Sequence, residues 1–120
     1  MSNFPQTILA VAAGGALGAS LRYGFVTFGL GGAWGILALN VAGSFLLGLV
    51  VASGEGRSDV LTAFLGAGLL GGLTTYSTYS YDIIRLGSVS VPQAALYVGL
   101  SLILGILAFI ASTMLVRAAS

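Results

Sequence analysis

The sequence has no cysteine, no histidine and no lysine, and it carries only three acidic residues against four arginines. Without cysteine and histidine, the chain cannot form disulfides, ligate metals through thiols or imidazoles, or relay protons through histidine. Charged residues make up 6% of the chain, roughly a quarter of their usual share in a soluble globular domain. The net charge of +1 and the lack of a basic run also argue against a nucleic-acid partner.

Apolar residues make up 58% of the 120 positions, and the mean hydropathy is +1.08. This composition is typical of a protein whose helices lie in a lipid bilayer. No basic segment precedes the first apolar stretch, so we expect a retained span and not a cleaved signal. We therefore predict a multi-pass protein of the plasma membrane, which in a bacterium is the inner membrane.

Four apolar stretches are long enough to cross a bilayer as helices. They are Thr7–Phe28, Ala33–Ser53, Val60–Leu86 and Val91–Val116. The connections between them are short, and neither a linker nor a low-complexity tract interrupts the chain. The sequence therefore predicts an all-α integral membrane protein, with residues 1–120 forming a single four-helix transmembrane domain.

The four arginines divide evenly between the two sides of the membrane. With four spans, Arg57 and Arg117 lie on one side, and Arg22 and Arg85 lie on the other. The positive-inside rule then favours neither orientation. Either the chain has one orientation that the charges do not reveal, or it inserts both ways and pairs with an antiparallel copy of itself. We favour dual topology.

The third stretch contains a glycine pair followed by a run of hydroxyl and aromatic side chains, from Gly71 to Asp82. Eleven helical residues from Val60 rise about 16 Å, roughly half of the hydrocarbon core. Because Gly71 and Gly72 tolerate positive φ, we expect them to break the helix near the midplane. A kinked helix whose hydroxyls bond to its own carbonyls is the alternative, but it explains poorly so many polar side chains in one span.

Two polar groups in the first half of the chain stand out. Asn40 and Ser44 are four residues apart and share a helix face. Asn40 would either make an interhelical hydrogen bond or line a pore, and we slightly favour the pore. Arg22 is either an interfacial anchor or a fixed positive charge at the mouth of an anion pathway, and the sequence leaves both open.

The second half of the chain contains few titratable groups. Asp82 and Arg85 are three residues apart and predict a local ion pair. In the last stretch, Tyr97, Ser101 and Ser112 share a face that is either a polar track or a packing seam. With no other carboxylate deep in a span, the sequence favours passive conduction over proton-coupled transport. Composition does not choose between an anion and a cation.

Three segments resemble the Fluc/CrcB fluoride channel family in order and spacing: Gly14–Tyr23, Asn40–Gly48 and Gly71–Tyr79. The resemblance implies an antiparallel, dual-topology homodimer with two fluoride pores. It also implies a structural sodium ion at the dimer centre, held by the backbone carbonyls of Gly71 and Thr74.

The resemblance also implies a fluoride route through this chain. The predicted route consists of Arg22, Asn40, Thr75, Tyr76, Ser77, Tyr79, Tyr97 and Ser101. The family has phenylalanine at the positions of Tyr76 and Tyr79, so each ring here gains a hydroxyl that needs a partner. Asp82 replaces a family glutamate and has a shorter reach.

The predicted function is a fluoride-selective passive channel, not an enzyme, which exports cytoplasmic fluoride and lowers its toxicity. The alternative is a small dual-topology multidrug exporter driven by protons. That class needs an intramembrane carboxylate, usually in the first span, and Thr7–Phe28 has none. A non-transporting assembly subunit is a third possibility.

Overall fold

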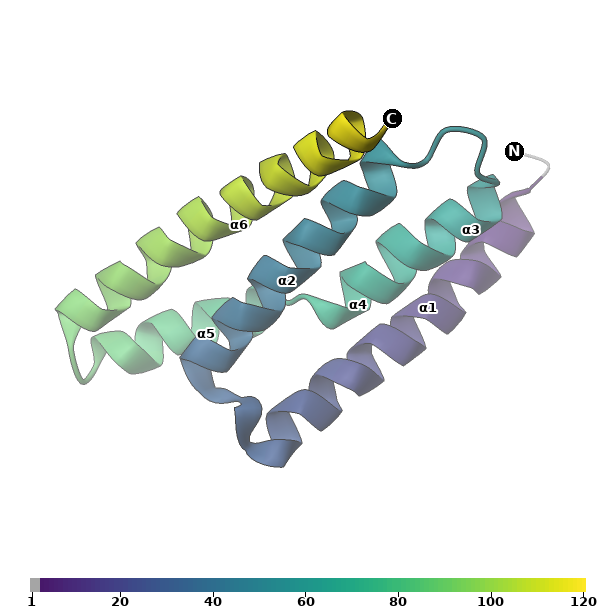
Figure 1. Cartoon of the computed structure of the whole chain (residues 1–120). Coiled ribbons are helices and arrows are strands. Elements are labelled where there is room, and N and C mark those ends of the chain that lie inside the picture. Colours follow the sequence, from purple (N-terminus) through teal and green to yellow (C-terminus); the bar gives the residue numbers. More distant parts are fainter. Residues whose placement is uncertain (1–2) are drawn as a thin grey trace.

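A computed structural model describes residues 3–120, and in this part of the chain all the regular structure is helical (Figure 1). The first span is α1 (Phe4–Phe25), continued by the short π-helix η1 (Val26–Leu30), and the second is α2 (Gly32–Ala52). The third consists of α3 (Asp59–Ala63), the π-helix η2 (Phe64–Leu70), α4 (Gly71–Leu73) and α5 (Tyr76–Gly87). The fourth is α6 (Val91–Ala119).

The described residues contain four helices long and apolar enough to cross a membrane, as the sequence predicts. They run over Phe4–Leu30, Gly32–Ala52, Asp59–Gly87 and Val91–Ala119, within a few residues of the predicted bounds. The first connection is tighter than expected, because the chain kinks at Gly29 and turns at Gly32, with φ values of 86° and 77°. Only glycine adopts such angles without strain. The chain is thus a multi-pass membrane protein.

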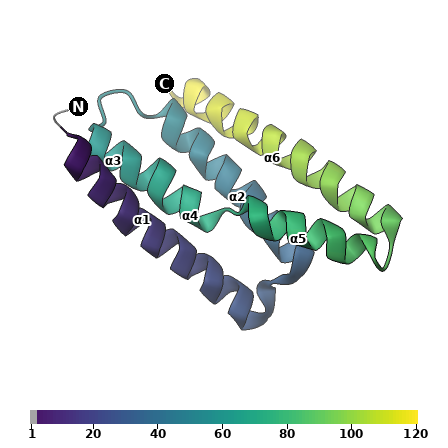
Figure 2. The same cartoon turned by 180° about the vertical axis from the view of Figure 1, so that it is seen from behind.

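The third span changes its neighbours halfway along its length. Before the break, η2 and α4 pack along α1; after it, α5 packs against α6 and α2. Both views show α3 and α4 beside α1, while α5 diverges from α1 toward the N-terminal end of α6 (Figures 1 and 2). The break therefore lies where the span passes from one helix pair to the other.

Close packing between α1 and the third span depends on glycines from both sides. A methyl group on Gly14 would lie 2.8 Å from the Leu69 backbone nitrogen, and one on Gly72 would lie 2.7 Å from the Gly15 carbonyl oxygen. A methyl group on Gly18 would collide with the Leu69 carbonyl. These glycines therefore make the facing sides of α1 and the third span a helix-packing surface.

The predicted position of the break is wrong by one helical turn. Gly71 is helical, with φ −62° and ψ −36°, and Gly72 lies within α4. The extended residues are Thr74 (φ −88°, ψ 158°) and Thr75 (φ −150°, ψ 125°). Gly72 instead lets α4 approach α1, because a methyl group there would meet the Gly15 backbone. The break in the middle of the third span is nevertheless confirmed.

The packing between α1 and the third span yields the first testable prediction. Gly18→Ala should lower the free energy of unfolding by about 1–3 kcal/mol, because the added methyl group meets backbone that must move. Gly24→Ala on the same helix is the matched control, since a methyl group there meets nothing within 4 Å. Thermal unfolding of the purified protein in detergent measures both. Equal melting temperatures for the two variants would contradict this packing.

Candidate functional site

The break is held from α2 by the side chain of Asn40. Its Nδ2 donates to the Thr75 carbonyl at 3.1 Å, and its Oδ1 accepts from the Thr75 amide at 2.9 Å. One turn along the same face, Gly43 leaves room for the Thr74 methyl group, which a Cβ at that position would strike. The interhelical hydrogen bond that the sequence left as one of two alternatives for Asn40 is therefore present, and both of its amide atoms take part.

Arg22 reaches the break from the opposite side. Its Nε donates to the Gly72 carbonyl oxygen at 3.1 Å, across 50 residues of sequence. That carbonyl would bond to the amide of residue 76 in a continuous helix, but the chain is extended at Thr74 and Thr75. Arg22 is therefore not a simple interfacial anchor, because its guanidinium satisfies backbone that the break exposes.

Hydroxyl groups make hydrogen bonds to the backbone where α4 ends and α5 begins. Thr75 is the N-cap of α5, and its Oγ1 accepts from the Thr78 amide at 3.2 Å and lies 3.3 Å from Ser77 Oγ. Thr74 and Ser80 donate to carbonyls of their own segment, those of Leu70 and Tyr76. The hydroxyl-to-carbonyl bonds of the kinked-helix alternative thus occur alongside the break.

Besides the Gly72 carbonyl, two further backbone carbonyls at the break lose their usual helical partners. The Gly71 carbonyl would accept from the Thr75 amide, but that amide donates to Asn40. The Thr74 carbonyl would accept from the Thr78 amide, which donates to Thr75 Oγ1 instead. In hydrocarbon, such oxygens need another donor or a cation. The side chains of Asn40 and Thr75 thus leave these oxygens available for other partners.

A cavity of about 700 Å³, which we call the break groove, opens between α2 and the third span. Its polar and aromatic lining comes from Asn40, Ser44, Thr62, Thr74, Thr75, Tyr76 and Tyr79, and Gly71 also lines it. The remaining lining is mainly aliphatic. The structure thus brings together four residues of the predicted fluoride route and both carbonyl-bearing residues of the predicted sodium site.

Four aromatic rings form a row that starts at the break groove, passes through the interior and ends at Trp34, which is 43% exposed. The centroids of Tyr76 and Tyr79 are 6.0 Å apart, and those of Tyr79 and Tyr97 are 5.3 Å apart. Trp34 meets Tyr97 edge-on at 5.6 Å. Tyr76 is 80% exposed on the single chain, whereas Tyr97 is fully buried. The rings therefore connect an open surface with the interior.

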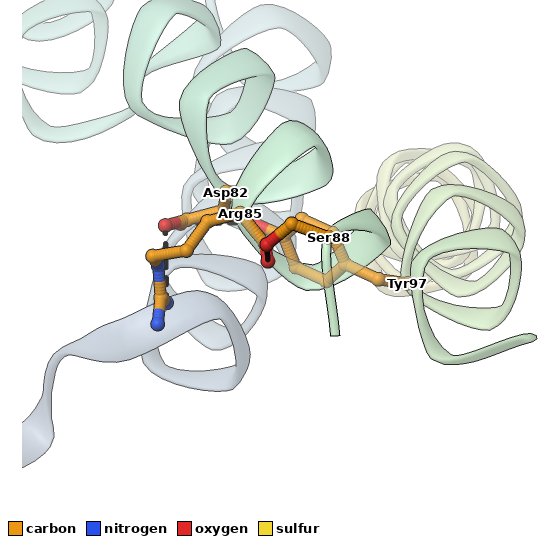
Figure 3. A network of polar contacts seen from close by, with 4 residues as sticks. All are labelled: Asp82, Arg85, Ser88 and Tyr97. Atoms are coloured by element: carbon orange, nitrogen blue, oxygen red, sulfur yellow. Dashed lines mark hydrogen bonds and ion pairs between the residues drawn. The ribbon is translucent and has the colours of Figure 1, made fainter. Parts of the chain in front are cut away.

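Tyr97 also belongs to a charged network around Asp82 (Figure 3). Asp82 Oδ1 lies 3.4 Å from Arg85 Nη2, and the Tyr97 hydroxyl donates to Asp82 Oδ2 at 3.4 Å. Ser88 donates to the Arg85 carbonyl at 2.7 Å. The predicted ion pair is confirmed, but Asp82 is only 3% exposed. A buried carboxylate needs such partners, because its desolvation is costly.

Ser101 faces a second, smaller cavity of about 360 Å³ between α2 and α6. Its Oγ is buried and has no hydrogen-bond partner among residues 3–120. Ser44 lines both cavities, and its hydroxyl donates to the Asn40 carbonyl. Farther along α6, Ser112 packs against Gly48. The face that the sequence left open is thus polar at Ser101 and a packing seam at Ser112.

A broken span with a polar groove at its centre can hold an ion away from bulk water. A family model described as CrcB-like protein, Camphor Resistance (CrcB), matches residues 9–113. The chain belongs to the CrcB family. The family that the sequence motifs predict is therefore confirmed.

Curated relatives match nearly the whole chain. A protein of Idiomarina loihiensis named fluoride-specific ion channel FluC is 39% identical over 123 residues, covering 96% of this chain and 95% of the relative. One of Cereibacter sphaeroides with the same name is 40% identical, covering 93% and 95%. Fluoride-specific ion channel FluC 1 of Rhodococcus jostii is 44% identical, covering 88% and 82%.

Some features of the site lack a clear sequence signal. Trp34 was not a candidate, because nothing in the spacing of the second span relates it to Tyr97. The bond between Tyr97 and Asp82 joins residues 15 positions apart on different helices. Ser44, by contrast, could have been included, because it lies one turn from Asn40 on the same face.

The Asp82 network yields the second prediction. Tyr97→Phe removes the donor to a buried carboxylate, and should cost about 1–3 kcal/mol of folding free energy. The ring remains against Trp34, the only tryptophan in the chain, so its emission maximum should not move. Thermal unfolding and tryptophan fluorescence measure the two effects. Tyr23→Phe on the exposed surface of α1 is the control; equal stability of the two variants would show that the hydroxyl contributes nothing.

Proposed function

We propose that this protein is a passive, fluoride-selective channel that exports fluoride from the cytoplasm and so lowers its toxicity. Two findings support the proposal. The chain belongs to the CrcB family, whose curated members matched here are named fluoride-specific ion channels. The break groove gathers amide, hydroxyl and aromatic groups halfway along a membrane span. The groove is the observation that carries the proposal, because lipid alone would not tolerate it.

The residues of the groove suit a small anion that must shed water. Asn40 keeps one Nδ2 proton after its bond to Thr75. Ser77 does not line the groove, but it adds a hydroxyl beside it, 3.3 Å from Thr75 Oγ1. The rings of Tyr76 and Tyr79 present edges with positive partial charge. Together such groups replace part of the ion's hydration shell. Arg22 adds a fixed positive charge on the other side of the break.

Tyr97 and Ser101 extend the proposed route beyond the groove. Tyr97 contributes its ring and not its O–H group, because the hydroxyl donates to Asp82. Ser101 offers a buried hydroxyl, and Ser44 lines the cavities on both sides. The route therefore has two neighbouring parts, one at the break and one along α6.

The Gly71 and Thr74 carbonyls form the proposed sodium site. The helical partners of both oxygens donate elsewhere, which fits a role as cation ligands. Neutral carbonyl oxygens are suitable ligands for a hard cation. Sodium would supply positive charge that compensates these oxygens inside the membrane. No cluster of acidic, histidine or cysteine side chains competes with them among the described residues.

The proposed assembly is an antiparallel homodimer with dual topology and two pores. The even distribution of arginines supports insertion in both orientations. The open side of the break groove, with its exposed Tyr76, would then be closed by the second copy. No observation favours the proton-driven exporter: α1 has no carboxylate, and the buried Asp82 is paired with Arg85 and Tyr97.

Reconstituted protein should release fluoride from liposomes and pass little chloride. Asn40→Asp should slow fluoride efflux about tenfold or more, because a fixed negative charge need repel the ion by only about 1.4 kcal/mol to do so. A fluoride electrode measures the efflux, and a chloride electrode measures selectivity. Thr113→Val is the control, since the Thr113 hydroxyl bonds only within α6.

Equal fluoride and chloride rates in the wild type would remove the proposal. Unchanged efflux in Asn40→Asp would place Asn40 off the ion route while leaving the channel function intact.

Dual topology is tested by labelling, which the lack of native cysteine makes simple. Ser88→Cys places a single thiol in the connection between α5 and α6. In intact cells, a membrane-impermeant maleimide should label about half of the copies, because the two orientations are equally favoured when arginines balance. Glu55→Cys, in the connection after α2, should give the complementary half. Labelling of nearly all copies at one site and none at the other would rule out dual insertion.

A further inference from the structure

The Asn40 side chain makes two hydrogen bonds to the same backbone residue, Thr75, which is in an extended conformation. This pairing resembles one rung of a β-ladder, with a side-chain amide in place of a second strand. It fixes both the amide and the carbonyl of Thr75. Asn40 thus acts on the backbone of the break itself.

The Thr75 amide has two competing acceptors. In a continuous helix it would donate to the Gly71 carbonyl, four residues earlier. The preceding amide, that of Thr74, still makes its helical bond to the Leu70 carbonyl at 3.1 Å. The helical hydrogen-bond pattern therefore stops at the Thr75 amide, which donates to Asn40 instead. Whichever acceptor holds this proton determines whether the Gly71 carbonyl is free.

We propose that Asn40 is a positioning residue, whose side chain keeps the Gly71 carbonyl free for a cation by holding the Thr75 amide away from it. This inference rests on the sodium site of the proposed function and assigns a cause to it. It also gives Asn40 two separable tasks. One is performed by its acceptor oxygen toward Thr75, and the other by its remaining N–H toward the fluoride route.

Two substitutions separate these tasks. Asn40→Asp keeps an acceptor oxygen for the Thr75 amide but places a negative charge on the fluoride route. Asn40→Leu has nearly the same shape and offers neither donor nor acceptor, so the Thr75 amide is released to the Gly71 carbonyl. The first variant should retain the cation site and lose fluoride conduction. The second should lose both.

The experiment compares melting temperatures of the purified full-length protein in sodium chloride and in N-methylglucamine chloride at equal ionic strength. A cation that binds only the folded protein raises its melting temperature, and N-methylglucamine is too large to reach two backbone carbonyls. Wild type, Asn40→Asp and the control Thr113→Val should show a sodium-dependent rise. Asn40→Leu should show none.

A full sodium-dependent rise in Asn40→Leu, or its loss in Asn40→Asp, would overturn the inference. If Asn40→Leu does not fold, the comparison of Asn40→Asp with wild type decides alone. Absence of the rise in a wild type that still conducts fluoride would overturn the inference and leave the channel function standing. The expected sodium pattern in a protein that conducts no fluoride would support the inference while removing that function.

Discussion

Backbone polar groups within a bilayer need partners, and at Thr74–Thr75 these partners come from outside the third span. Asn40 holds the Thr75 amide and carbonyl, and Arg22 holds the Gly72 carbonyl. Without them, several hydrogen-bonding groups would be exposed to hydrocarbon, each at a cost of several kcal/mol. The broken conformation is stable because two other spans supply the missing bonds. The groove and the free carbonyls follow from this arrangement.

The glycines of α1 and the third span also help to stabilise the break, because they allow close helix packing. They bring the two backbones close enough for Arg22 to reach Gly72, because no side chain separates the helices at Gly18 and Gly72. On the other side, Gly43 makes room for Thr74 beside Asn40. Small residues on α1 and α2 therefore allow both helices to approach the third span closely at the break.

The four spans, the break and most of the groove could be predicted from the sequence, because hydropathy and polar spacing along one helix are local signals. Asn40 was found in this way. The exact position of the break was not, because the conformational freedom of Gly71 and Gly72 suggested a role in bending, whereas both glycines are helical and Gly72 packs against α1. The hydrogen bond from Arg22 to the Gly72 carbonyl joins residues 50 positions apart, and neither alternative for Arg22 included it. Such distant pairings leave no periodic trace in the sequence.

Both side chains that form hydrogen bonds to the backbone of the break precede it in the chain. Arg22 and Asn40 are synthesised before Thr75, so both partners already exist when the third span is made. An unsatisfied turn need never face lipid alone at any stage of biosynthesis. The order of the partners along the polypeptide thus allows a costly conformation to be adopted as soon as it emerges, without waiting for the last span.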